Sequence, residues 1–151
     1  MMLEAHIFRG EYLDTCAHIE RWAITVIETP VAQATDQVGN RLPHLFGQKL
    51  KLVRELAQND AVFARANRVR DLLDELEPFA KLRSALAHAT CSATRDGESA
   101  IFAFDLPGAA APPSMEGRFW LMREETARLI AQLKKIKKEL ADQKIKDVTP
   151  P

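Results

Sequence analysis

The chain has 151 residues, 46% of them hydrophobic and 28% charged, and its 21 basic and 21 acidic side chains cancel, which excludes a histone-like polycation or an acidic tail protein. Its two cysteines, Cys16 and Cys91, are distant and form no CxxC motif, which excludes a disulfide framework and a zinc finger. The longest apolar run, residues 22–27, is too short to span a bilayer, and the N-terminus lacks a basic signal-peptide start, so we expect a cytoplasmic protein without membrane association.

Helical periodicity dominates the chain up to residue 90. Apolar side chains recur at helical spacing in residues 3–28, and Pro30 is placed to end this first helix. Residues 42–58 predict a second helix with Pro43 in its first turn, where the missing N–H costs nothing. Residues 60–90 predict a third helical stretch, in which Pro78 should cause a kink or a break.

The period changes after residue 90, and we expect a small β insert over residues 91–122. Asp96-Gly97 is a strong hairpin signal, residues 101–106 have the pattern of a strand, and residues 118–122 predict a third short strand. Residues 107–117 are rich in proline, glycine and alanine, which is typical of a mobile loop.

A last amphipathic helix is predicted over residues 123–143, followed by a flexible C-terminal tail, residues 144–151. The expected fold is mainly α: an antiparallel four- to five-helix bundle with a small β-hairpin or meander insert before the last helix. Residues 1–143 are expected to form a single helical-bundle domain.

Two charged residues stand on apolar helix faces. Glu20 has apolar side chains at its three-, four- and seven-residue offsets, namely Leu13, Cys16, Ala17, Ala23, Ile24 and Ile27. Arg83 has no charged residue at the same offsets. Because an unpaired buried charge costs several kcal/mol, we expect Glu20 and Arg83 to pair with each other across the bundle. A plain salt bridge that fixes helix register explains such a pair at least as well as a catalytic role.

Beside Arg83, a short polar motif ends at His88. Ser84 and His88 are four residues apart and share a helix face, so the hydroxyl could orient the imidazole. Arg83 and His88 are five residues apart, about 140° around a regular helix, which would not point both at one atom. A loosened last turn or a second subunit could bring them together. Taken alone, His88 is a C-terminal helix cap.

Residues 76–88, LEPFAKLRSALAH, resemble the signature of HEPN-domain proteins, in which Arg, a polar residue and then His end a helix of a bundle. The resemblance implies a metal-independent endoribonuclease site shared across a two-fold dimer. In it, His88 acts as general base on the ribose 2′-hydroxyl or protonates the leaving oxygen, and Arg83 holds the scissile phosphate. Ser84 stands where Asn, Asp or His is usual in the family.

The same resemblance also fits a non-catalytic binding, regulatory or scaffold module, so whether the chain is an enzyme stays open. We expect Arg83 and His88 as catalytic residues, Glu20 and Ser84 as supporting residues, and neither a cofactor nor a metal ion. The partners expected are RNA or a protein such as an antitoxin or a regulator.

Two further patterns concern partners. A basic block in the last helix could follow a phosphate backbone, although a solvated helix face explains it better in a neutral chain: Lys134, Lys135, Lys137 and Lys138. In the first helix, Trp22, Leu13, Ala17 and Ile24 widen the apolar stripe, which suggests a second buried surface and a homodimer.

Overall fold

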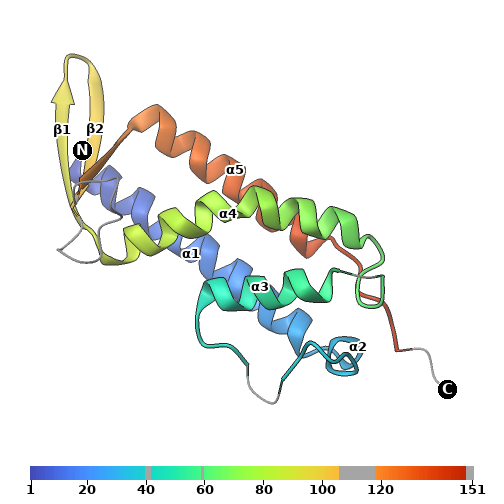
Figure 1. The fold of residues 1–151 in the computed structure, drawn as a ribbon. Helices are drawn as coiled ribbons and strands as arrows, with labels where there is room; N and C mark the ends of the chain where they lie inside the picture. The colour runs from blue at the N-terminus through green and yellow to red at the C-terminus, as the bar shows by residue number, and fades with distance from the viewer. Residues whose placement is uncertain (40–41, 59, 106–117, 149–151) are drawn as a thin grey trace. The chain divides into compact units, whose positions relative to one another are not determined.

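The computed structural model describes residues 1–39, 42–58, 60–105 and 118–148 (Figure 1). This part is mainly helical and contains one small antiparallel sheet just before the last helix, as expected. Its elements are, in chain order, α1 (Met2–Ile27), α2 (Pro30–Gln33), α3 (Phe46–Leu56), α4 (Ala66–His88), β1 (Thr90–Asp96), β2 (Ser99–Asp105), β3 (Arg118–Met122) and α5 (Arg123–Ala141).

The chain divides into two compact units. The first contains Met1–Cys16 and Lys81–Lys134, and the second contains Ala17–Ala80 and Lys135–Pro151. The helices α1, α4 and α5 each contribute residues to both units. The arrangement of the helices in one antiparallel bundle, and the single domain over residues 1–143, stay predictions.

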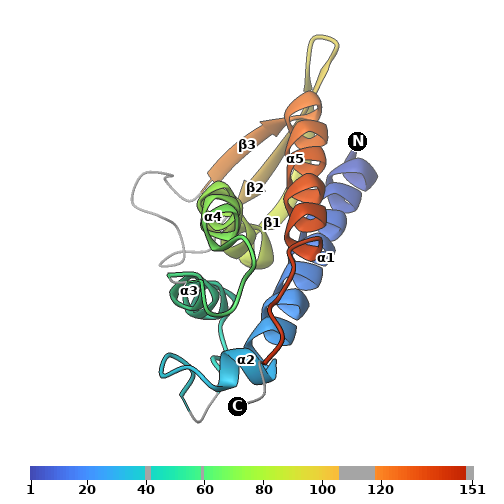
Figure 2. The ribbon, with the colours of Figure 1, turned by 90° about the vertical axis from the view of Figure 1, so that its right-hand side faces the viewer.

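The sheet of the first unit has the strand order β1-β2-β3, which Figure 2 shows side by side. Asp96 pairs with Ser99, so the hairpin turns at Gly97 and Glu98. Gly97 has φ +60°, a left-handed conformation that glycine adopts without steric cost. The Asp96-Gly97 signal is therefore confirmed as a hairpin.

One face of this sheet packs on α1. Phe102 and Phe104 of β2 are buried, and the ring of Phe104 lies 6.0 Å from that of Phe8. Phe8 in turn contacts Tyr12 edge to face at 5.7 Å. The side chain of Trp120, which lies opposite Ala103 in the register, remains 61% exposed. The core of the first unit therefore lies on the side of the sheet that bears the phenylalanines.

In the first unit, α1 and α5 run in the same direction. Arg123 binds Glu4, with 2.6 Å between Nη2 and Oε2, and Lys134 binds Glu11 further along both helices. Because the two pairs follow the same order in both helices, these helices are parallel. Not every helix pair in the chain is therefore antiparallel.

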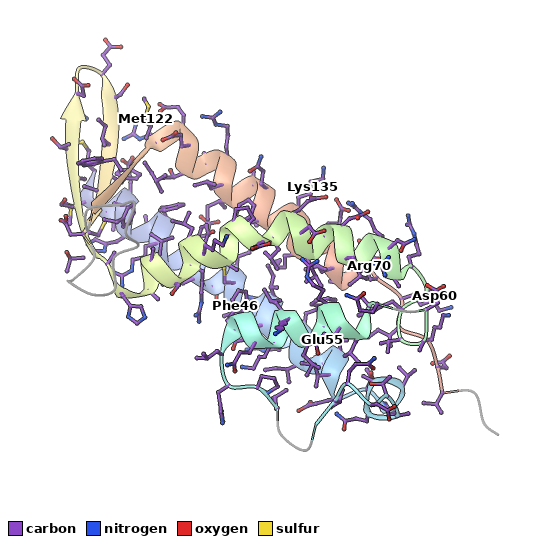
Figure 3. The ribbon with its side chains drawn as sticks, in the orientation of Figure 1. Phe46, Glu55, Asp60, Arg70, Met122 and Lys135 are labelled. Atoms are coloured by element: carbon purple, nitrogen blue, oxygen red, sulfur yellow. The ribbon has the colours of Figure 1, made fainter. Side chains whose placement is uncertain are left out.

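In the second unit, α3 and α4 are antiparallel. Arg54 near the end of α3 binds Asp74, and Arg70 from the preceding turn of α4 donates to the carbonyl of Ala57 at 2.7 Å. Figure 3 shows Phe46 and Glu55 toward opposite ends of α3. The ring of Trp22 stacks on Phe63 at 6.4 Å, so this part of the wide α1 stripe is used inside the chain. A homodimer stays a prediction.

The first helix ends before Pro30, as expected, since α1 ends at Ile27, whereas Pro43 lies outside the helix in whose first turn it was expected. Pro43 precedes α3, which begins only at Phe46, while Pro30 opens the short helix α2. Thr29 caps α2 by accepting a hydrogen bond from the backbone N–H of Ala32. Proline has no backbone N–H, and the first turn of a helix needs none for its internal hydrogen bonds. Proline is therefore compatible with the start of a helix as well as with its end.

Two further predictions are refined. The helix α4 continues through Pro78 without a break, flanked by the buried Leu76 and Phe79. Residues 144–146, at the start of the expected tail, form backbone hydrogen bonds with residues 62–64 of 2.8 and 3.0 Å. The expected mobile loop, residues 107–117, lies outside the described residues.

The packing of the sheet on α1 predicts the effect of truncating one ring. Phe104→Ala should lower the free energy of unfolding by about 3–5 kcal/mol, because it leaves a cavity beside Phe8. The matched control is Trp120→Ala on the neighbouring strand, where the exposed ring should cost less than about 1 kcal/mol. Urea denaturation followed by far-ultraviolet circular dichroism measures both, and equal losses would contradict this assignment of the core.

Candidate functional site

The motif residues lie in the last turns of α4, which stays regular to its end. The N–H of Ala89 donates to the carbonyl of Ala85 at 3.0 Å, and β1 begins one residue later. The expected loosening of the last turn is thus not observed. Because the helix is regular, Arg83 and His88 project about 140° apart around its axis.

The burial of the motif residues differs. Ser84 and His88 are exposed, and Arg83 is half-buried. Since Ser84 and His88 are one turn apart on the same face, the imidazole is open to solvent with a hydroxyl nearby. Ser84 and His88 therefore lie on one face of α4, and Arg83 lies on another.

Arg9 contacts the end of α4 and is not among the site residues expected from the sequence. This half-buried residue of α1 donates from Nη2 to the carbonyl of Ala87 at 3.2 Å. A cation at the C-terminus of a helix is favourable, because the last carbonyls there carry partial negative charge. In the sequence, Arg9 borders the apolar stripe, with Ala5, Tyr12 and Leu13 one turn away. Neighbour counting could have singled it out, but not its partner.

The charge of Arg9 also acts on the first residues of β1. Burial raises the pKa of the Cys91 thiol, and the guanidinium of Arg9 opposes this by favouring the thiolate. Arg9 therefore lies beside the junction of α4 and β1, and His88 is the last residue of α4 before this junction. This places a positive charge at the end of the helix that carries the exposed imidazole.

The structure gives Glu20 a partner within the second unit. Its carboxylate lies 2.6 Å from Nζ of Lys49, which also donates to the carbonyl of His44 at 3.0 Å, and the expected contact with Arg83 stays a prediction. The Lys49 side chain is 8% exposed and that of Glu20 is 24% exposed. Glu20 thus has a counter-charge, and this pair lies within the second unit.

The sequence does contain the signal for Lys49. Its three-, four- and seven-residue neighbours are all apolar: Leu42, Leu45, Phe46, Leu52, Val53 and Leu56. The neighbour test that singled out Glu20 therefore also singles out Lys49. Which buried charge pairs with which depends on the helices that pack against each other. Only the tertiary structure shows this.

The lysine block of α5 is partly engaged with acidic groups of the chain. Lys134 binds Glu11. Arg68, which donates a hydrogen bond to Glu139, lowers the pKa of that carboxyl, and nearby Lys135 adds to the effect. Figure 3 places Lys135 on α5. Lys137 is half-buried and Lys138 is exposed. RNA binding by this block stays a prediction.

A groove of about 390 Å³ lies in the first unit between α1 and α5. Its apolar floor includes Phe8, Phe102 and Ile130, and the ion pair of Glu4 and Arg123 lies at its rim. Arg83 and His88 are not among its lining residues. The motif is thus presented on the outside of a helix end rather than inside this groove.

The chain matches no protein-family model, no curated protein and no solved structure. The described residues contain no group of three or more histidine, cysteine or acidic side chains placed to hold a metal ion. Within the same residue ranges, none of the helices is long and apolar enough to cross a membrane. The resemblance to HEPN-domain proteins therefore depends on the motif and its place at the end of a helix before a β insert.

The Glu20–Lys49 pair predicts a large effect of removing its carboxylate. Glu20→Ala should lower the free energy of unfolding by about 2–4 kcal/mol, because it leaves the Lys49 ammonium buried without a counter-charge. The matched control is Asp74→Ala, which breaks the exposed pair with Arg54 and should cost less than about 1 kcal/mol. Denaturant melts of both variants check this, and a Glu20→Ala loss no greater than that of the control would refute it.

Proposed function

We propose that the chain is a HEPN-like, metal-independent endoribonuclease that acts as a homodimer. The observation that carries the proposal is the exposed His88 at the end of a regular helix, with the half-buried Arg83 earlier on the same helix. Imidazole is the side chain that most often transfers protons in catalysis, and that of His88 is exposed. A guanidinium is suited to neutralise a phosphate.

The proposed reaction is a transesterification within RNA. His88 takes the proton of the ribose 2′-hydroxyl, and the 2′-oxygen forms a bond to the adjacent phosphorus. The bond from phosphorus to the 5′-oxygen breaks, and that oxygen receives a proton. Arg83 offsets the negative charge that develops on the phosphate oxygens. The products are a 2′,3′-cyclic phosphate and a 5′-hydroxyl.

The proposal needs two copies for a geometric reason. On a regular α4, Arg83 and His88 of one chain project about 140° apart. A two-fold axis near the end of α4 would let a residue of one copy complete the site of the other. The reaction also needs one base and one acid, and two motifs supply two imidazoles.

The partners and the location that we propose are those expected from the sequence. The lysines of α5 would contact the RNA backbone, and the protein would act in the cytoplasm. A protein partner such as an antitoxin or a regulator would cover the motif.

The same helix geometry favours a second candidate, a non-catalytic binding or regulatory module. The regular last turn of α4 does not by itself bring Arg83 to His88. If copies do not share a site, the motif would act as a docking feature only. This alternative differs from the first in predicting binding without cleavage.

Cleavage of single-stranded RNA in the presence of a chelator tests the proposed reaction, which uses only side chains of the protein. His88→Ala should lower turnover by about 10²–10⁴-fold, the usual contribution of one acid–base group, with little loss of stability. The matched control is His44→Ala, which removes another exposed imidazole and should leave turnover unchanged. Light scattering should give the mass of a dimer, and the product should carry a cyclic phosphate.

Four outcomes count against the nuclease. Cleavage that persists in His88→Ala, or that requires added Mg²⁺, would exclude this mechanism. A monomer across micromolar concentrations would exclude the shared site. A folded dimer that binds RNA without cleaving it would support the non-catalytic module instead.

A further inference from the structure

Arg9 is a half-buried residue of α1 whose side chain reaches the end of α4. It contacts the carbonyl of Ala87, the residue before His88, and has no part in the motif or in the proposed reaction. Its charge also reaches Cys91, on the other side of His88 in the chain. Arg9 therefore stands beside the short segment that presents the imidazole.

This position solves a problem of charge for any phosphate that approaches His88. The C-terminus of a helix carries about −0.5 elementary charge, which repels an anion. A guanidinium at the last carbonyls offsets that charge. Arginine has five N–H donors, so one hydrogen bond to Ala87 leaves others to hold phosphate oxygens, in a planar arrangement that suits them.

It also solves a problem of direction. A regular helix sends Arg83 about 140° away from His88, so Arg83 is poorly placed to hold the phosphate on which His88 of the same chain would act. Arg9 approaches from another helix and is not bound by the spacing of the motif. The contact of Arg9 with the carbonyl of Ala87, the residue before His88, makes it a second candidate for this cation.

We infer that Arg9 binds the scissile phosphate of RNA next to His88 of the same chain. This inference rests on the proposed function for the identity of the ligand. Each chain then has its own phosphate-binding residue. The second copy of the chain would supply Arg83 or the second imidazole, but it would not be needed for the contact between Arg9 and the phosphate.

The test measures binding of a single-stranded 2′-O-methyl oligonucleotide, which keeps the phosphates but has no 2′-hydroxyl to react. Arg9→Gln keeps an N–H donor for the Ala87 carbonyl and removes the charge. It should weaken binding by roughly 10- to 100-fold, the usual effect of losing one charged hydrogen-bonding group. The slope of log affinity against log salt concentration should fall by about one.

The matched control is Arg128→Gln on α5. Arg128 is exposed and also donates from its guanidinium to a backbone carbonyl, that of Glu124 at 3.4 Å. The two variants therefore remove the same charge and the same kind of contact from one unit. Arg128→Gln should change affinity by less than about 3-fold, because the carbonyl that Arg128 contacts belongs to α5 and not to the end of α4. Circular dichroism confirms that each variant is folded.

A second substitution keeps the inference open to refutation if Arg9→Gln does not fold. Arg9→Lys retains the charge but loses the planar pair of donors, so affinity should fall by roughly 3- to 10-fold. Wild-type affinity in Arg9→Lys together with an unfolded Arg9→Gln would overturn the inference. Equal affinities of folded Arg9→Gln and Arg128→Gln would overturn it as well.

Failure of the two proposals can be told apart. If the wild type cleaves RNA and Arg9→Gln binds the oligonucleotide like the control, the Arg9 inference is wrong while the nuclease stands. If the wild type binds but does not cleave, and Arg9→Gln loses binding, the nuclease is wrong while the Arg9 phosphate contact stands. If the wild type does not bind the oligonucleotide, the Arg9 inference is wrong.

Discussion

The apolar stripe of α1 has to be covered along the whole helix, and both compact units are built on it. Seven of its side chains are at most 5% exposed: Ala5, Phe8, Tyr12, Cys16, Ile19, Ala23 and Val26. Burying one large apolar side chain contributes about 1.5–3 kcal/mol, whereas a surface ion pair contributes at most about 1 kcal/mol. Burial on α1 therefore determines which residues meet, and pairs such as Glu4–Arg123 form between side chains that burial has already brought close.

Local patterns were sufficient to predict most elements of this fold. The stripe predicted α1 within a residue at each end, and β3 has the expected bounds. The errors occur where a local rule has two solutions. Proline is found before a helix as well as in its first turn, so Pro43 was placed inside a helix that begins only at Phe46. The pairing of residues 62–64 with 144–146 joins distant segments and has no local signal at all.

The candidate site shows the same division between local and tertiary information. Helix-neighbour counting correctly identified Glu20 as a charge that needs a counter-charge, since its ammonium partner is almost fully buried. It did not identify Lys49 as a partner of Glu20, because Lys49 and Arg83 both have apolar neighbours at helical spacing. Arg9 is a harder case: the carbonyl that it binds is 78 residues away, and any carbonyl would serve equally as an acceptor. Backbone acceptors carry no sequence signal.

The energetics of Arg9 bear on why an arginine stands there. A hydrogen bond from a charged group contributes about 1.5–3 kcal/mol, and a cation at a helix C-terminus adds about 0.3–1 kcal/mol. Ordering a long arginine side chain costs up to about 1.5–2 kcal/mol of rotamer entropy. Capping α4 therefore gives Arg9 a modest net stabilising effect. The bond to the Ala87 carbonyl uses one of the five N–H donors of the guanidinium, so capping the helix and binding an anion are compatible roles for this residue.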